Sequence, residues 1–241
     1  MKTAIITAST KGIGKSIALK LLSEGCFVIM NYSNNDGIAN ELNVELTKHY
    51  PNQFKIIKAD LSSYDDMTIF VDECLTKIKM INYLVLNTGI TVRESFEELS
   101  LDSWTNVMDT NLNIPFFTVQ KFSKYIYDKG SIVFIGSILG EIPHSVSIPN
   151  GVSKAGIHFL AKSLVKEFAE QKVTVNAICP GFVDTSWQLL KSPKIRKSIE
   201  EKTALGRFAK PEEIADLCYS ILTNGFINGS IINIDGGYSF Q

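Results

Sequence analysis

Seven short apolar runs recur along the chain, separated by longer segments with helical periodicity. The runs are Thr3–Ala8, Phe27–Tyr32, Phe54–Ala59, Tyr83–Leu86, Ser131–Gly136, Val173–Ile178 and Ile231–Ile234. Each run is almost continuously apolar, which is typical of strands buried on both faces, and the intervening segments are long enough for helical crossovers. The pattern predicts an α/β, doubly wound fold with one seven-stranded parallel sheet and helices on both faces.

Two connecting segments, Phe96–Asp128 and Val183–Leu222, are longer than one ordinary helix needs. In the first, Ser100 offers a helix cap and a second apolar series begins at Asn111, which predicts two helices. In the second, Pro211 is followed by two glutamates, a pattern typical of the first turn of a helix.

One domain accounts for the whole chain. A sequence of 241 residues with 45% apolar content can bury a substantial core. No linker, low-complexity tract or repeat interrupts the strand pattern, so we expect residues 1–241 to form a single domain. Within it, the stretch at about 183–207 is a candidate flap over a substrate.

Charge and cysteine usage exclude several classes of partner. The chain has 24 Lys and Arg residues against 25 Asp and Glu residues, so we expect neither nucleic acid nor an anionic membrane as a partner. No apolar stretch is long enough for a signal peptide or a membrane span, and we expect a cytoplasmic protein. The widely spaced cysteines predict reduced, buried thiols and no metal site. They are Cys26, Cys74, Cys179 and Cys218.

A glycine-bearing loop, Thr7–Gly14, follows the first strand and leads into a helix. Its glycines would let the backbone approach a pyrophosphate, and the helix N-terminus would supply N–H groups and a positive dipole. A glycine pair alone also fits a tight turn, but its place after the first parallel strand favours a Rossmann-type dinucleotide-binding fold. The candidate contacts are Thr7, Ser9, Thr10, Lys11, Gly12, Ile13 and Gly14.

The end of the second strand indicates which dinucleotide binds. An acidic residue usually stands there in NAD-binding versions, whereas this chain has Asn31, Tyr32 and Ser33. Lys11 in the glycine loop could attract a 2′-phosphate, so we expect NADP(H), although Lys11 could also be a solvated loop lysine. Asp60 and Asn87 follow the third and fourth strands, where they could contact the cofactor or act as turn residues.

The stretch from Ser137 to Lys154 carries the candidate catalytic groups. Ser137 ends an apolar run, and a helical pattern opens at Asn150, so that Asn150 and Lys154 share one helix face. A serine at a strand end and a lysine on the next helix could flank a small polar substrate and a sugar hydroxyl. Asparagine cannot release a proton near neutral pH, so this arrangement lacks an acid.

Together these residues resemble the short-chain dehydrogenase/reductase family, and within it the 3-oxoacyl-[acyl-carrier-protein] reductases. The resemblance covers the whole chain. It implies an oxidoreductase, an NADP-dependent ketoreductase of fatty acid or polyketide biosynthesis, that acts on an acyl-carrier-protein or coenzyme A thioester as a homotetramer. Its motifs are Thr7–Gly14, Asp60-Leu61, Asn87-Thr-Gly89, Asn111, Ser137, Ser153-Lys154-Ala155, Val175–Thr185, Leu205–Phe208, Pro211–Ile214 and Asn233–Gly237.

The resemblance also implies roles for single residues. In such enzymes the residue matching Ser137 orients the substrate carbonyl, and the one matching Lys154 holds the nicotinamide ribose. The residue matching Asn111 anchors a water in a proton relay. The adenine end of the cofactor lies near the matches of Asp60, Leu61, Asn87 and Gly89. The nicotinamide end lies near the matches of Pro180, Gly181, Val183 and Thr185.

Three positions depart from the family pattern. Ala8 replaces a glycine and Thr88 replaces an alanine, exchanges that small shifts should accommodate. Asn150 stands in the place of the tyrosine acid, and loss of general acid catalysis costs a factor of about 100 to 10,000. Asn150 could polarise a carbonyl as an amide donor.

The proton would then come from the substrate, from His144, or from water ordered by Lys154 and Asn111. Tyr125 and Tyr127 are not expected to replace the acid, because they belong to the helix before the Ser137 strand.

Three hypotheses remain: a reductase that uses Asn150 as a donor, a non-catalytic cofactor-binding homologue with an assembly or regulatory role, and an engineered Tyr-to-Asn form. The apolar excess of the helices from Asn111 and Asn150 is consistent with a homotetramer. Lys129 and Lys172 could contact an acidic carrier protein, or could be solvated lysines.

Overall fold

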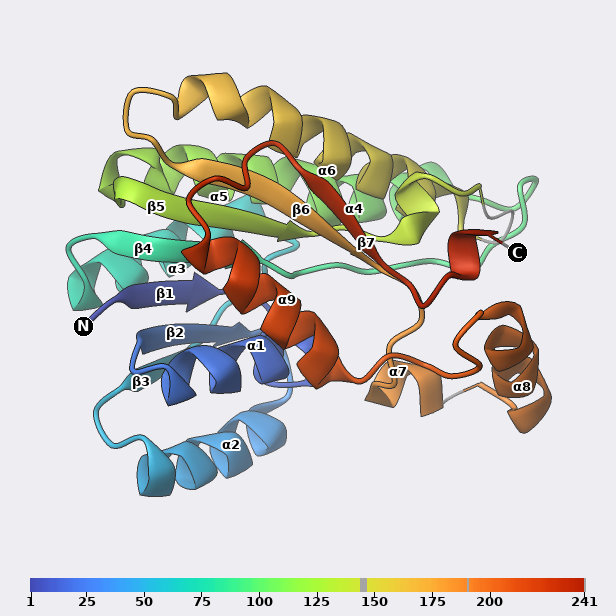
Figure 1. The fold of residues 1–241 in the computed structure, drawn as a ribbon, viewed down its shortest axis with the longest axis horizontal. Helices are drawn as coiled ribbons and strands as arrows, with labels where there is room; N and C mark the ends of the chain where they lie inside the picture. Colours follow the sequence, from blue (N-terminus) through green and yellow to red (C-terminus); the bar gives the residue numbers. More distant parts are fainter. Residues whose placement is uncertain (144–146, 190, 241) are drawn as a thin grey trace.

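The computed structural model describes residues 1–143, 147–189 and 191–240, and the chain folds around one seven-stranded sheet (Figure 1). The order is β3-β2-β1-β4-β5-β6-β7, and every neighbouring pair is parallel. The predicted doubly wound α/β fold and all seven predicted strands are therefore confirmed. The strands are β1 (Thr3–Ile6), β2 (Phe27–Tyr32), β3 (Phe54–Lys58), β4 (Ile81–Leu86), β5 (Ile126–Ile135), β6 (Thr174–Pro180) and β7 (Ile231–Ile234).

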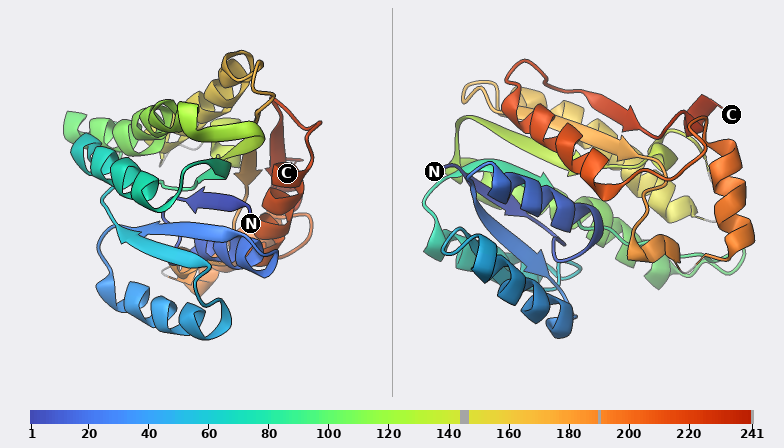
Figure 2. Two further views of the ribbon diagram at one scale, coloured as in Figure 1. Left: turned by 90° about the vertical axis from the view of Figure 1, so that its left-hand side faces the viewer. Right: turned by 60° about the horizontal axis from the view of Figure 1, so that its bottom comes forward.

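Helices cover both faces of the sheet (Figure 2). One face carries α1 (Gly12–Ser23), α2 (Asp36–His49) and α9 (Pro211–Thr223). The other carries α3 (Tyr64–Lys77), α5 (Ile114–Phe122) and α6 (Ile148–Glu167). Successive strand residues alternate between the two cores, so Ile5 packs with the second set of helices and Ile6 with the first. No helix in the described part of the chain is both long and apolar enough to cross a membrane.

Both helix starts predicted from capping patterns are confirmed. Ser100 precedes α4 (Leu101–Met108), and its Oγ accepts a 3.0 Å hydrogen bond from the backbone N–H of Ser103. Pro211 occupies the first turn of α9, where it needs no hydrogen-bond partner for its nitrogen.

The two helices predicted for the fourth connection are one continuous helix. A π-helical turn, Asp109–Asn113, joins α4 directly to α5, so Asn111 lies inside the helix and does not begin a second one. Such turns carry one extra residue and are frequent at functional sites. The sequence pattern suggested a break because the extra residue shifts the phase of the apolar series.

Two other boundaries differ from expectation. β5 begins at Ile126, so Tyr127 belongs to the strand and not to the preceding helix. It still lies at the amino end, away from Ser137. α6 begins at Ile148, two residues before Asn150, with Pro149 in its first turn. β5 extends further than predicted because its first residue, Ile126, pairs with Ile81 of β4 ahead of an irregular stretch.

Candidate active site

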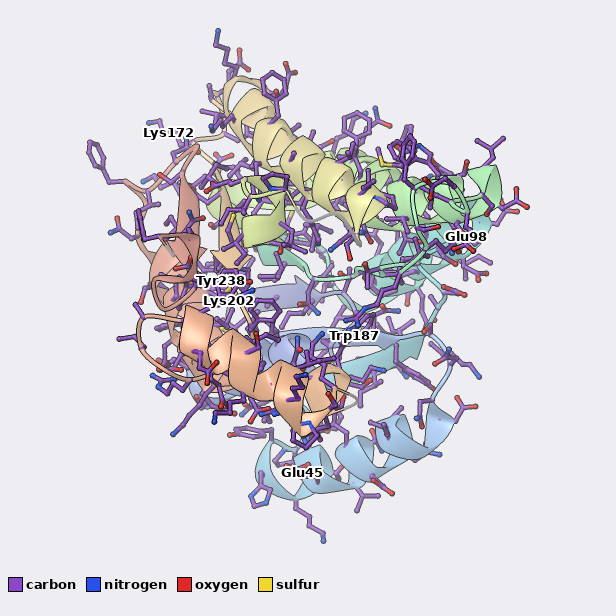
Figure 3. All side chains as sticks on the ribbon, turned by 90° about the vertical axis from the view of Figure 1, so that its right-hand side faces the viewer. Glu45, Glu98, Lys172, Trp187, Lys202 and Tyr238 are labelled. Atoms are coloured by element: carbon purple, nitrogen blue, oxygen red, sulfur yellow. The ribbon has the colours of Figure 1, made fainter. Side chains whose placement is uncertain are left out.

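The candidate site lies along the carboxyl edge of the sheet, where the strand order reverses between β1 and β4. Ligands of doubly wound sheets bind in the crevice at this position. Figure 3 faces this edge and labels Trp187 on α7 (Ser186–Leu189) and Lys202 on α8 (Pro193–Lys202). The loops that leave the strands here carry most of the predicted site residues, together with the first turns of α6.

The loop between β1 and α1 is closely packed. Gly12 has a φ of +55°, a conformation that favours glycine, and Lys11 is exposed. A Cβ at Gly14 would lie 2.5 Å from the backbone oxygen of Ala8 and 2.6 Å from Asn87 Nδ2. Position 14 therefore admits only glycine unless the loop moves. Three hydroxyl residues of the loop are buried: Thr7, Ser9 and Thr10.

Ala8 adopts a strained backbone conformation, with a φ of +49°. A non-glycine residue in the left-handed region costs roughly 1–2 kcal/mol, so the exchange from glycine is less mild than the sequence suggested. Asn31 holds the loop in place. Its Oδ1 accepts a 3.1 Å hydrogen bond from Ala8 N, and its backbone N–H donates to Ser9 Oγ at 3.0 Å.

At the end of β2 the structure places a carboxylate that the sequence analysis missed. The Tyr32 hydroxyl donates to Asp36 Oδ1 at 2.9 Å, and Lys58 Nζ donates to Asp36 Oδ2 at 3.0 Å. The hydrogen bond from Lys58 lowers the pKa of Asp36. The expectation that no carboxylate lies near this strand end is wrong, because the first turn of α2 brings Asp36 back to Tyr32. The four-residue spacing was the available signal.

The loops after β3 and β4 are built differently. Asp60 Oδ1 accepts hydrogen bonds from the backbone N–H and the hydroxyl of Ser62, at 3.1 and 2.9 Å, as a turn residue does. Leu61 is buried in the core, so only its backbone faces the edge of the sheet. Asn87 Nδ2 donates to the backbone oxygen of Ala8 at 2.9 Å and thereby joins the two loops across the switch point.

Lys154 is buried beside the end of β5. Its Nζ donates a 2.7 Å hydrogen bond to the carbonyl of Ile135, and burial lowers the pKa of Lys154 to about 8. A Cβ at Gly89 would lie 3.3 Å from this Nζ, so the glycine keeps the amine open toward the loop after β4. Ser137 is half-buried, and its Oγ accepts a 3.1 Å hydrogen bond from Leu139 N, which leaves its O–H to donate.

Asn111 and Asn150 are joined by a hydrogen bond. Asn111 Oδ1 accepts from the backbone N–H of Ile90 at 2.8 Å, and its Nδ2 donates to the carbonyl of the same residue at 2.9 Å. This pair fixes which end of the Asn111 amide donates. The same Nδ2 lies 3.2 Å from Asn150 Oδ1 and 3.0 Å from Ser153 Oγ. The oxygen of Asn150 therefore faces Asn111, and its NH₂ group is left to donate elsewhere.

The residues expected at the nicotinamide end follow β6. Pro180 ends the strand, and Gly181 N donates to the last carbonyl of β7 at 3.0 Å. Val183 is buried and forms an isolated parallel bridge with the segment before α9. A Cβ at Gly12 would lie 3.3 Å from Thr185 Cγ2, so Thr185 reaches the glycine loop from the far side of the switch point.

The segment 183–207 holds α7 and α8 and is attached at its base. Arg196 of α8 lies 3.0 Å from Asp184, and its guanidinium stacks 4.4 Å above the Phe208 ring. Phe182 packs edge-on against Tyr238 at a centroid distance of 5.0 Å. Arg196 thus links α8 to Tyr238 through Phe208 and Phe182.

The remaining candidates lie elsewhere. Lys129 and Lys172 are exposed neighbours at the amino ends of β5 and β6, where Lys129 N donates to Gln171 O at 2.8 Å (Lys172 is labelled in Figure 3). At about 3.3 Å per residue, Lys129 is about 26 Å along the strand from Ser137. His144 is outside the described residues.

Sequence comparisons match the chain over its full length. A family model described as enoyl-(acyl carrier protein) reductase matches residues 7–239. The 3-oxoacyl-[acyl-carrier-protein] reductase of Aquifex aeolicus (strain VF5) is 32% identical over 240 residues, covering 98% of this chain and 96% of the relative.

Solved structures share the fold. A short-chain dehydrogenase/reductase from Serratia marcescens BCRC 10948 superposes with a TM-score of 0.93 at 28% identity, covering 99% of this chain and 98% of its own. The angucycline C-6 ketoreductase LanV with bound NADP gives a TM-score of 0.93 at 26% identity, covering 100% of this chain and 96% of its own. Because sequence and fold agree along almost the entire length, the chain belongs to the short-chain dehydrogenase/reductase family.

Proposed function

We propose that this protein is an NADPH-dependent reductase of a ketone, with a 3-oxoacyl thioester of acyl carrier protein or coenzyme A as its substrate. The fixed orientation of the Asn150 amide carries the proposal. Its oxygen is held by Asn111 at 3.2 Å, so its NH₂ group is a positioned donor one helix turn from Lys154.

The reaction requires charge stabilisation at the carbonyl oxygen. Hydride addition turns a neutral ketone into an alkoxide, and Ser137 and Asn150 are the two donors proposed to hold that oxygen. Removal of one such donor typically costs a factor of about 100 to 1,000 in turnover. The amide cannot supply the proton. In this proposal a water beside Lys154 supplies it, because an amine whose pKa is about 8 exchanges protons readily near neutral pH.

The residues present fit a dinucleotide. The first turn of α1 contains no acidic residue, and the Lys11 side chain does not cap the helix. The backbone N–H groups at the start of α1 can therefore bind a phosphate. Among the described residues, Thr88 Oγ1 is buried without a hydrogen-bond partner, and a polar ligand in the crevice would satisfy it. Lys11 and Lys58 offer positive charge to a 2′-phosphate and offset Asp36. When bound, NADPH supplies the hydride.

The segment 183–207 is proposed as the substrate flap of this single domain. Thr185 already reaches the glycine loop, and exposed apolar side chains of the segment suit an acyl chain. These side chains are Trp187, Leu189, Ile195 and Leu205.

A homotetramer is proposed for the assembly. A surface hollow lies between α5, with its preceding π turn, and α6, and Phe159 beside it is 73% exposed. Apolar surface of this kind marks protein interfaces. The other apolar lining residues are Leu112, Phe116 and Leu160. Contact with a carrier protein through Lys129 and Lys172 is not required by the proposal, because both lie at the opposite edge from Ser137.

NADPH oxidation with a panel of short 3-oxoacyl thioesters tests the function. We expect slow, measurable turnover that falls by about 100-fold or more in Ser137→Ala. Ser220→Ala, which changes an exposed serine on α9 outside the hollow between α5 and α6, is the control. The second candidate function is a cofactor-binding protein without turnover, favoured by the missing acid at Asn150. Tight NADPH binding without oxidation of any thioester, in the chain and in Asn150→Tyr, would support it. A tyrosine codon in the source genome would identify an engineered form.

A further inference from the structure

Three side chains able to bind a metal ion meet beneath the candidate active site. Glu141 follows the turn after Ser137, His158 is in α6 and Cys179 is in β6. One ligand atom of each lies within 4.8 Å of the other two, and Cys179 Sγ is 3.0 Å from His158 Nε2. The sequence predicts no metal site, because these residues are far apart along the chain and form no motif.

Two glycines make room for the imidazole. A Cβ at Gly136 would lie 2.6 Å from His158 Nε2, and a Cβ at Gly140 would lie 2.6 Å from His158 Cε1. Both glycines flank Ser137. The imidazole is buried, and these two glycines leave the space that it occupies.

A neighbouring group orients the carboxylate. Asn233 Nδ2 donates to Glu141 Oε2 at 2.8 Å. Contacts of this kind usually support metal ligands from outside. Cys179 is fully buried whereas Glu141 is exposed, so an ion can enter from the side of the carboxylate.

We propose that Glu141, His158 and Cys179 bind one Zn²⁺ ion, with water as the fourth ligand. Sulfur and imidazole ligands select zinc over magnesium or calcium, which prefer oxygen. On binding, the Cys179 thiol releases its proton to water, and the resulting thiolate and the Glu141 carboxylate together balance the two positive charges of the ion. Zinc bonds of about 2.0–2.3 Å keep tetrahedral ligand atoms about 3.5 Å apart, so small side-chain rotations from the observed separations suffice.

A zinc ion at this position would stabilise the structure around the candidate active site. The ion would cross-link the segment after Ser137, the middle of α6 and the end of β6, all of which border the candidate catalytic groups. His158 is one helix turn beyond Lys154, and Cys179 immediately precedes Pro180. Binding would therefore hold the Ser137 segment against the helix that carries Asn150.

Cobalt(II) titration of the full chain tests the site, because cobalt replaces zinc and reports thiolate ligation by a charge-transfer band in the near ultraviolet. We expect one cobalt ion per chain, displaced by Zn²⁺. Cys179→Ser and His158→Gln should remove the band, and Glu141→Gln should weaken binding at least about tenfold. Cys218→Ser, a buried thiol on α9, and His49→Gln, at the end of α2, are controls expected to leave it unchanged.

Absence of the band at millimolar cobalt, or its persistence in Cys179→Ser, would overturn the proposal and leave the Cys179–His158 contact as a simple hydrogen bond. If Cys179→Ser fails to fold, Glu141→Gln decides, since Glu141 is exposed, and unchanged affinity in that variant contradicts the site. These measurements need neither NADPH nor a ketone. Their outcome is therefore separate from that of the proposed function.

Discussion

The side-chain oxygen of Asn150 accepts a 3.2 Å hydrogen bond from Nδ2 of Asn111, which Ile90 holds through both of its backbone polar groups. The amide at position 150 is thus oriented from another helix. If Asn150 is the preferred hydrogen-bond donor, replacing it should lower turnover. If position 150 only lacks an acid, a tyrosine there should raise turnover.

Replacement of Asn150 by tyrosine is expected to raise turnover by about 100-fold or more, the usual scale of a general acid. The phenol would stand one helix turn from Lys154, whose positive charge favours the phenolate and lowers the phenol pKa. NADPH affinity should change little. Steady-state kinetics with one thioester measures both, and Asn150→Phe is the control without a hydroxyl. Lower activity in Asn150→Tyr would instead show that the asparagine is the preferred donor.

The preference for NADPH over NADH should depend on Lys11. Loss of one charge-assisted contact to the 2′-phosphate is expected to reduce the preference about tenfold in Lys11→Ala. Fluorescence titration with both dinucleotides measures it. Lys15→Ala is the control, because Lys15 is paired with Glu45 on the side of α1 that faces α2. Equal affinities in the unmodified chain would refute the NADPH assignment.

Burial lowers the pKa of Lys154 to about 8 from 10.5, so the folded state loses this proton at a lower pH than the unfolded state. Between these values the unfolded chain binds more protons, and the contribution of Lys154 to the free energy of unfolding therefore rises with pH. Lys154→Met lacks this contribution. Its stability relative to the unmodified chain should be greatest below pH 8 and should decrease toward pH 10.5, as urea unfolding would measure. If the difference in free energy of unfolding between Lys154→Met and the unmodified chain does not change with pH, the pKa of Lys154 is not lowered by folding.

Ala8→Gly is expected to leave the free energy of unfolding unchanged or raise it by up to about 1.6 kcal/mol. Relief of left-handed strain, roughly 1–2 kcal/mol, outweighs the added flexibility of the unfolded chain, about 0.4–1 kcal/mol. Ala18→Gly, in the interior of α1, should lower it by about 1 kcal/mol or more. Urea unfolding of both variants makes the comparison, and equal losses would show that Ala8 is not strained.

The proposed tetramer should depend on Phe159. Glutamate at this position would place a charge in the apolar face between α5 and α6, and light scattering should then detect a smaller assembly. Phe226→Glu is the matched control, since Phe226 is 98% exposed and lies outside the hollow. A monomeric mass for the unmodified chain at micromolar concentration would exclude the tetramer.

Most of the fold followed from one simple signal. Strands buried on both faces must be apolar at nearly every position, so the runs that include Ile5 and Ile29 stood out from their surroundings. The start of β5 was missed because three exposed residues follow the buried Ile126, as Tyr127 and Asp128 show. Strand ends at a solvated edge carry little hydrophobic pattern.

The candidate site was only partly predictable. Motifs located Ser137 and Lys154 because their chemistry depends on residue type and local spacing. The pairing of Asp36 with Lys58 depends on where α2 begins relative to β3, and the meeting of His158 with Cys179 depends on how α6 lies on β6. Such contacts depend on how helices and strands pack against each other, and the hydrophobic periodicity of the sequence does not predict this packing.

The π turn Asp109–Asn113 also constrains how this helix can change over evolutionary time. Deleting one residue there would let the turn close to regular α geometry with α4 and α5 still in phase, but it would remove the widened turn that brings Asn111 to Ile90. Length changes are commonly tolerated in surface loops. The extra residue of this turn is needed whatever its side chain is. Homologous proteins should therefore keep the length of this helix even where its exposed residues differ.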